Sequence, residues 1–178
     1  MHISQFNIYT FIDSFDENKI LNFSSNHSVI YRNYEHKIDL KTIFQIKKVC
    51  KRNKIKFYLA NNIKLALQAN LDGVYIPSFN RSLNLNNFKN KRKNFTIMGS
   101  AHNISEIKFK EKQGINLIFL SPLFLTKNYN NCLGIIKFNL ISRLTNKKVI
   151  ALGGIREKNL NKLKILNVVG FSGITIFN

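Results

Sequence analysis

The stretch KFYLANNIKLALQANLDGVYI, residues 56–76, contains the pattern that decides the fold. Lys56–Ala60 and Gly73–Ile76 are short runs of apolar, aromatic and β-branched residues, which are typical of strands. Ile63–Gln68 lies between them and has the apolar spacing of a helix. Two strands joined in this way run parallel and are connected by a right-handed crossover, so the stretch predicts a strand–helix–strand unit.

The same alternation continues on both sides of this unit. Six further runs predict strands, at Asn7–Phe11, Ser28–Tyr31, Thr96–Ser100, Asn116–Leu120, Lys148–Ala151 and Gly173–Phe177. Helices are expected after an N-cap at Asp39 and at Ile104–Gln113, Ile135–Arg143 and Leu160–Leu166, with weaker patterns at Asp16–Asn22 and Leu83–Phe88. Eight such units close a barrel more naturally than they extend a sheet, so we expect an α/β fold, a compact (β/α)₈ TIM barrel that spans residues 1–178 as one domain.

The predicted eighth strand runs almost to the end of the sequence at Asn178. We therefore expect the barrel to lack its last helix. Apolar surface beside the first and eighth strands would then be covered either by the N-terminal segment or by another subunit, which leaves a homo-oligomer open.

Composition sets the class of protein. Hydrophobic residues make up 44% of the 178 residues, which suffices for one sizeable core. No apolar stretch approaches the ~20 residues of a membrane-spanning helix, and the start MHISQFN lacks the regions of a signal peptide, so we expect a cytoplasmic protein with no membrane partner. Cys50 and Cys132 lie far apart, and the spacing of Cys and His predicts neither a disulfide framework nor a zinc site.

The net charge of +19 predicts attraction to anions. Lys, Asn, Ile and Phe are abundant together, a pattern that AT-rich coding sequence produces by drift. We therefore assign the charge to composition and a general preference for anions, and not to dedicated binding of nucleic acid. The basic run FKNKRKN, residues 88–94, is interpreted as an exposed loop, with phosphate contacts to a polymer as the alternative.

Two adjacent glycines end the strand in VIALGGIREKN, residues 149–159. Such a pair either permits a turn with positive φ or lets a ligand approach the backbone closely. In a parallel barrel, phosphate groups bind at the loops after strands seven and eight. The amides of Gly153 and Gly154, with those around Phe177 and Asn178, therefore predict a cradle for a phosphate dianion.

Four segments in register resemble one known family. VIALGGI and VVGFSGITIF are similar to the closing segment of the thiamine phosphate synthase and TenI (aminothiazole tautomerase) family, whose members are (β/α)₈ barrels. LANNIKLALQANLDGVYIPS resembles that family's third and fourth strand region, IMGSAHNISE its fifth strand, and LIFLSPLFLT its sixth. The order and spacing agree from about Val29 to the C-terminus.

The resemblance implies a reaction and a pyrophosphate site. In the synthase, a pyrimidine pyrophosphate loses its pyrophosphate and a thiazole phosphate nitrogen captures the resulting carbocation-like species. Arg32 matches the arginine that binds pyrophosphate through bidentate hydrogen bonds. The family's companion lysine is Tyr34 here, and its glutamine is Ile30.

The resemblance also implies Mg²⁺, but this sequence departs from the metal-binding pattern. Asn61 matches the first residue of an Asn-Asp pair and is expected to contact substrate, whereas the metal-binding aspartates are replaced by Asn62 and Asn80. Because a hard cation prefers anionic oxygen, we expect no protein-held metal or strongly weakened magnesium binding.

Other matches complete the expected site. Ser100 matches a substrate-contacting serine and His102 a nearby histidine, which could instead cap the next helix. Thr126, Lys127 and Asn128 match the loop that contacts the thiazole phosphate, and its next lysine is Tyr129 here. We expect Arg32, Lys127 and Ser100 to be catalytic.

These matches favour a thiamine phosphate synthase-like protein of thiamine biosynthesis, a transferase whose partner is a small phosphorylated molecule. Two alternatives stay open: a catalytically silent barrel that binds a phosphorylated metabolite, and a TenI-like thiazole tautomerase. YIPS, residues 75–78, resembles the tautomerase branch, but that branch's catalytic histidine is Pro122 here.

Overall fold

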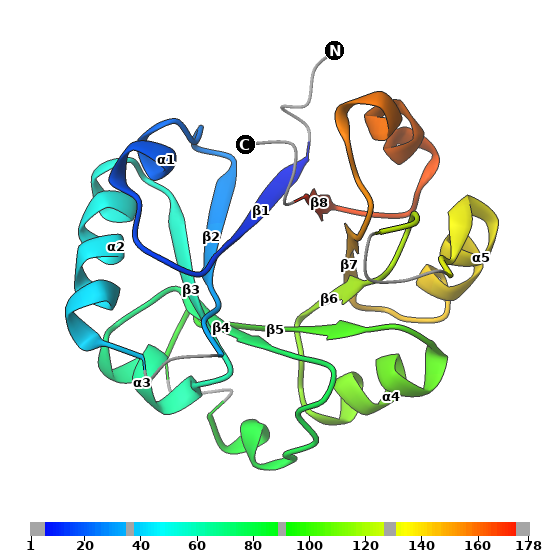
Figure 1. Cartoon of the computed structure of the whole chain (residues 1–178). Helices are drawn as coiled ribbons and strands as arrows, with labels where there is room; N and C mark the ends of the chain where they lie inside the picture. Colours follow the sequence, from blue (N-terminus) through cyan, green and yellow to red (C-terminus); the bar gives the residue numbers. More distant parts are fainter. Residues whose placement is uncertain (1–5, 35–37, 89–91, 127–130, 174–178) are drawn as a thin grey trace.

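The computed structural model describes residues 6–34, 38–88, 92–126 and 131–173. Eight parallel strands form a closed barrel in sequence order, and helices surround it (Figure 1). The strands are β1 Asn7–Ile12, β2 His27–Tyr31, β3 Lys56–Ala60, β4 Gly73–Ile76, β5 Thr96–Ala101, β6 Leu117–Leu120, β7 Lys148–Leu152 and β8 Gly170–Ser172. The predicted (β/α)₈ barrel is therefore confirmed.

Short helices connect most of the strands. They are α1 Glu17–Leu21, α2 Leu40–Arg52, α3 Ile63–Gln68, η2 Asn84–Phe88, α4 Ile104–Lys112, α5 Gly134–Ser142 and η3 Glu157–Ile165, where η marks a 3₁₀ helix. Asp39 caps α2 by accepting hydrogen bonds from the backbone N–H groups of Lys41 and Thr42, as its sequence position predicts. Among the described residues, no helix is long and apolar enough to cross a membrane.

The eighth strand lies earlier in the chain than predicted. The sequence favoured Gly173–Phe177 because that run ends in β-branched and aromatic residues, but β8 is Gly170–Ser172 and Gly173 follows it; residues 174–178 lie outside the described residues. A Cβ on Gly170 would lie 2.2 Å from the carbonyl oxygen of Asn7. The glycine thus marks the place where β8 approaches β1 and closes the barrel.

A second difference concerns the expected helix at Leu160–Leu166. This segment belongs to the 3₁₀ helix η3, which begins earlier, at Glu157. Leu160 and Leu163 are its buried residues and lie three positions apart, so they fall on one face of a helix with three residues per turn.

Apolar residues fill two separate layers. The larger layer lies between the strands and the surrounding helices, and Ile43, Ile46 and Phe138 are fully buried there. The smaller layer fills the barrel itself, and five of its ten buried residues are aromatic: Tyr9, Phe11, Tyr58, Tyr75 and Phe119. Successive residues of a strand alternate between these two layers, and this alternation determines which side chains project toward the barrel axis.

Candidate functional site

A cavity of about 350 Å³ opens at the carboxyl-terminal end of the barrel. In parallel barrels this is the end where ligands bind. Five residues that the sequence predicted for the site line it together: Arg32, Ser100, His102, Thr126 and Gly153. They come from the ends of β2, β5, β6 and β7, so the closed barrel brings together positions that are far apart in sequence.

Arg32 enters the cavity directly after β2. Its backbone N–H donates to the carbonyl oxygen of Ile12, 2.8 Å away, which fixes the start of the loop. The guanidinium carbon lies 4.7 Å from the centre of the Phe11 ring, a cation–π contact that holds the side chain at the top of the barrel. Because no described carboxylate forms an ion pair with Arg32, its charge is available to an anionic ligand.

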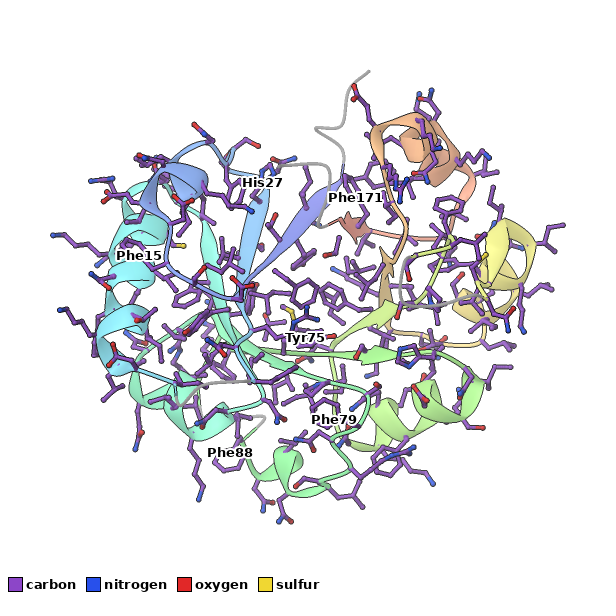
Figure 2. The ribbon with its side chains drawn as sticks, viewed as in Figure 1. Phe15, His27, Tyr75, Phe79, Phe88 and Phe171 are labelled. Atoms are coloured by element: carbon purple, nitrogen blue, oxygen red, sulfur yellow. The ribbon has the colours of Figure 1, made fainter. Side chains whose placement is uncertain are left out.

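Two exposed aromatic rings border the same cavity. The rings of Tyr34 and Phe79 meet edge to face with centroids 5.7 Å apart, although they are 51% and 65% exposed. Tyr75 lies near the barrel axis, and Phe79 lies on the loop that follows β4 (Figure 2). Large exposed rings around a cavity suit the binding of a flat ring system.

The floor of the cavity is polar at two points. Ser100 ends the inner face of β5 and is 5% exposed, while Ser121 follows β6 and is 7% exposed. Both hydroxyls can donate hydrogen bonds or accept them. They are therefore suited to orienting a bound heterocycle.

His102 is held by a carboxylate of its own loop. Its Nδ1 lies 2.9 Å from Glu106 Oε2, and the same oxygen accepts a hydrogen bond from the backbone N–H of His102. Asn103, and not His102, caps α4 by accepting a hydrogen bond from the Glu106 N–H. The histidine thus lies directly before the N-cap of α4 and also lines the cavity.

The two glycines after β7 have positive φ angles of +94° and +68°. A Cβ on Gly154 would lie 2.5 Å from the carbonyl oxygen of Leu125, and one on Gly153 would lie 2.9 Å from the Cα of Pro122. The glycines therefore allow both a turn and the close approach of the loop after β6. Neither of their N–H groups donates to another described residue, so both remain able to bind an anion.

A second pocket of about 640 Å³ lies next to this turn. Thr126 lines both this pocket and the first cavity, whereas Gly154 lines only the second. Sequence reasoning missed three basic residues of the second pocket, Arg156, Lys158 and Lys162. They follow the glycines in the segment REKNLNK, and the basic residues of that segment were the sequence feature that could have indicated an anion-binding pocket.

The asparagines at the expected magnesium end have other partners. Asn62 caps α3 by accepting a hydrogen bond from the Leu65 N–H, 3.0 Å away. Asn80 donates from Nδ2 to Asn61 Oδ1 at 2.7 Å and accepts from the Ser82 N–H through Oδ1. Asn61 is exposed and does not line the first cavity. Within the described ranges, no group of three His, Cys, Asp or Glu residues could hold a metal ion.

Four predicted site residues cannot be placed. Lys127, Asn128, Phe177 and Asn178 lie outside the described residues. Sequence reasoning also missed Phe79 and Ser121 as cavity residues, because no local motif indicates which loop residues a barrel brings together.

Comparison with known proteins supports the resemblance seen in the sequence. A family model described as thiamine monophosphate synthase matches residues 21–176. The chain is 29% identical over 137 residues to a thiamine-phosphate synthase of Prochlorococcus marinus and 30% identical over 135 residues to one of Coprothermobacter proteolyticus. Each match covers 75% of this chain, but only 38% and 62% of the two relatives.

The fold is also similar to that of a solved structure. Thiamine phosphate pyrophosphorylase from Pyrococcus furiosus superimposes with a TM-score of 0.75, over 98% of this chain and 88% of that one. At 17% identity, this likeness concerns the fold alone.

Proposed function

This chain belongs to the thiamine monophosphate synthase family, and from that premise we propose that it joins a thiazole phosphate to a pyrimidine pyrophosphate. The observation that carries the proposal is the gathering of Arg32, Ser100, His102, Thr126 and Gly153 around one cavity. The two heterocycles would meet there, between the polar floor and the aromatic pair of Tyr34 and Phe79.

The thiazole phosphate is assigned to the turn after β7. The amides of Gly153 and Gly154 would donate to phosphate oxygens, and Thr126 and Arg156 lie beside the same turn. Thr126 Oγ1 is buried and has no hydrogen-bond partner among the described residues, so it offers a further donor. Backbone amides and a guanidinium together suit a dianion.

The pyrophosphate is assigned to Arg32 at the end of β2, which is three strands from β7 in the closed barrel. In the reaction, the C–O bond between the pyrimidine methylene and pyrophosphate breaks, and pyrophosphate leaves with the electron pair. The thiazole nitrogen then donates its lone pair to the methylene carbon and forms the new C–N bond. Arg32, together with Lys127 as we propose from the sequence, would stabilise the charge of the departing group.

The residues present do not fit a magnesium ion held by the protein. Asn62 caps a helix, the Asn80 amide is engaged on both atoms, and neither supplies an anionic oxygen. We therefore propose that cationic side chains, and not metal-binding carboxylates, stabilise the leaving group here.

The test is a coupled measurement of binding and turnover. The purified chain is mixed with thiazole phosphate and pyrimidine pyrophosphate, with Mg²⁺ or with EDTA, and thiamine phosphate is quantified by chromatography. Product formation supports the proposal, and activity that persists in EDTA supports the cationic mechanism. Tight binding of both compounds without product would instead identify a silent metabolite-binding barrel.

A further inference from the structure

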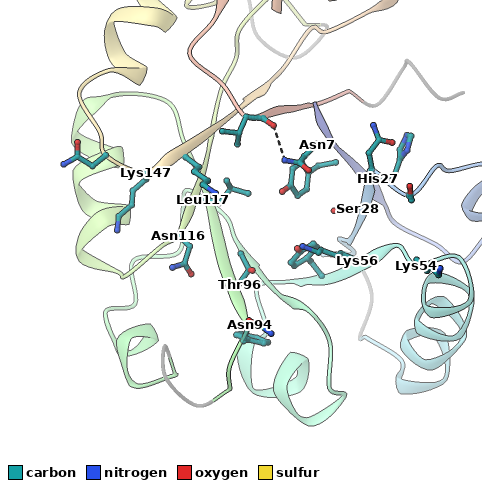
Figure 3. Close-up of a pocket in the computed structure, with 18 residues that line it drawn as sticks. Asn7, His27, Ser28, Lys54, Lys56, Asn94, Thr96, Asn116, Leu117 and Lys147 are labelled. Carbon is teal, nitrogen blue, oxygen red and sulfur yellow. Dashed lines mark hydrogen bonds between the residues drawn. The ribbon is translucent and has the colours of Figure 1, made fainter. Parts of the chain in front are cut away.

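The amino-terminal end of the barrel carries a larger cavity, of about 720 Å³, which we call the bowl (Figure 3). It lies at the end opposite the candidate active site. First residues of six strands line it: Asn7, His27, Lys56, Thr96, Leu117 and Lys148. Its volume is in the range of sites that take small molecules.

The alternation of side chains along the strands explains why the bowl is basic. Lys56 lies on the same face of β3 as Tyr58, and Lys148 lies on the same face of β7 as Ile150. Tyr58 and Ile150 belong to the layer inside the barrel. Both lysines therefore project from the inner face, toward the barrel axis.

The other two strands, β4 and β8, begin with glycine. Gly73 of β4 and Gly170 of β8 occupy inner-face positions at this end, where barrels usually carry bulky residues. Neither can be enlarged, because a Cβ would lie 2.0 Å from the Thr96 carbonyl oxygen or 2.2 Å from that of Asn7. The strands come close together at these points, and β4 and β8 begin without a side chain at this end of the barrel.

The cations stand on two opposing sides of the bowl. Lys54 and Lys56 belong to the β3 side and Lys147 and Lys148 to the β7 side, and these strands are four apart in a closed barrel of eight. Figure 3 shows Lys56 and Lys147 across the opening from each other.

These charges have no acidic counterpart in the bowl. No Asp or Glu lines it, and the three ion pairs among the described residues lie elsewhere, at Arg52–Glu17, His102–Glu106 and Lys108–Glu111. Acidic side chains lie outside this lining: the Asp72 carboxylate accepts a hydrogen bond from the Phe57 N–H and, after burial and Tyr9, contributes to the raised pKa of Tyr58. Four cations around a concave surface produce a field that attracts multivalent anions.

Hydroxyl groups line the deeper part of the bowl. Tyr9, Ser28 and Tyr58 are each less than 8% exposed and all line the cavity. Burial raises the pKa of Tyr9 to about 12 and raises that of Tyr58 as well, so both phenols remain protonated donors at neutral pH. The lysine ammonium groups and the buried O–H groups can both donate hydrogen bonds to phosphate oxygens.

We propose that the bowl binds a small organic polyphosphate of nucleotide size, whose phosphate groups bridge the Lys54 and Lys56 side and the Lys147 and Lys148 side. A compact ligand suits a concave cavity of this volume, whereas a nucleic acid strand requires a groove that continues across the surface. The inference does not depend on the proposed function, because it concerns the other end of the barrel.

The experiment is isothermal titration of the full chain with ATP and with tripolyphosphate, without Mg²⁺, at 50 and 150 mM salt. The test variants are Lys56→Gln/Lys148→Gln and, outside the strands, Lys54→Gln/Lys147→Gln. Lys41→Gln/Lys48→Gln on α2 is the charge-matched control, and Arg32→Gln reports binding at the carboxyl-terminal end. Thermal unfolding of each variant verifies its fold.

We expect saturable binding. The affinity should weaken about tenfold or more in both test variants, and less than twofold in Lys41→Gln/Lys48→Gln and Arg32→Gln. An equal loss in the α2 control would show diffuse attraction and overturn the proposal. A loss confined to Arg32→Gln would place the ligand at the active site and overturn it too. Binding of single-stranded RNA that excess ATP does not displace would also overturn the proposal.

Discussion

The two ends of the barrel present cations to a cavity by different means. At the carboxyl-terminal end, the cavity is shaped by backbone turns and loops, such as the glycine pair after β7 and the loop that carries Phe79. At the amino-terminal end, the bowl is shaped by the first inner-face residues of the strands. Substitutions at the first end should therefore change shape as well as chemistry, whereas lysine substitutions in the bowl should change only charge.

The largest expected effect is on turnover at the carboxyl-terminal end. Arg32→Gln removes the charge opposite the leaving pyrophosphate, and we expect kcat/KM to fall about 100- to 1,000-fold. Steady-state assays of thiamine phosphate formation measure this effect. Arg143→Gln, an exposed position at the end of α5, is the control and should retain activity. Equal activity of Arg32→Gln and wild type would remove Arg32 from the site.

The next effect is on the stability of the turn after β7. Gly154→Ala combines a positive φ with a Cβ 2.5 Å from the Leu125 carbonyl oxygen, and we expect a loss of about 3 kcal/mol in unfolding free energy. Gly134→Ala is the matched control, because its φ is also positive but no atom lies within 4 Å of the added Cβ. It should lose only about 1 kcal/mol in urea denaturation. Equal losses in the two variants would mean that the positive φ alone, and not the contact with Leu125, requires glycine at position 154.

A smaller effect is expected where Lys110 fixes the loop after β4. Its Nζ is buried and donates to the carbonyl oxygens of Pro77 at 2.8 Å and Asn80 at 3.1 Å, and to Gln113 Oε1 at 2.9 Å. Lys110→Met leaves the Pro77 carbonyl oxygen and Gln113 Oε1 without this donor, whereas the Asn80 carbonyl oxygen keeps the Gln113 Nε2 donor, and we expect a cost of about 2 kcal/mol at pH 7. Urea denaturation of both proteins measures this cost.

The same pair of proteins tests a pH dependence. Burial lowers the pKa of Lys110 to about 8, whereas the unfolded chain keeps this amine protonated up to about pH 10.5. Between these values the unfolded state binds more protons, so the free energy of unfolding should rise with pH. The advantage of wild type over Lys110→Met should be constant below pH 8 and grow by about 1 kcal/mol by pH 9. A constant difference across this range would contradict the lowered pKa.

The smallest expected effect concerns the aromatic pair at the cavity. Tyr34→Ala and Phe79→Ala should each weaken heterocycle binding about five- to tenfold, since each removes one ring of a pair worth about 1 kcal/mol. Tyr34→Phe keeps the ring and should bind as wild type does. Calorimetric titration with thiazole phosphate distinguishes the three, and a loss in Tyr34→Phe would assign the effect to the hydroxyl.

Local patterns predicted the order of elements well, because each strand and helix depends on neighbouring residues. Asp39 caps α2 as predicted, and seven of the eight predicted strands overlap those observed. The observed eighth strand, Gly170–Ser172, lies before the predicted Gly173–Phe177, most of which falls outside the described residues. Gly170 lowers strand propensity, although the close approach of β8 to β1 leaves no room for a Cβ there. The sequence pattern also did not distinguish the 3₁₀ helix at Glu157–Ile165 from an α-helix.

The candidate site was only partly predictable. Motif matches indicated Arg32, Ser100, His102, Thr126 and Gly153, which the barrel brings together. The contact between Tyr34 and Phe79 joins two loops distant in sequence, and no spacing rule indicates it. The basic lining of the bowl, in contrast, could have been predicted from the sequence. Lys56 and Lys148 begin strands, and the alternation of side chains places both on the inner face of the barrel.

The aromatic layer inside the barrel acts as a partition between the two cavities. Phe119 contacts Tyr9, which lines the bowl, with ring centroids 5.1 Å apart, and Tyr75, which lines the opposite cavity, at 5.4 Å. One ring thus touches a wall of each compartment. Phe119 therefore offers a route of direct contacts between the two cavities, and by thermodynamic reciprocity any influence of one occupant on the affinity for the other must be equal in both directions.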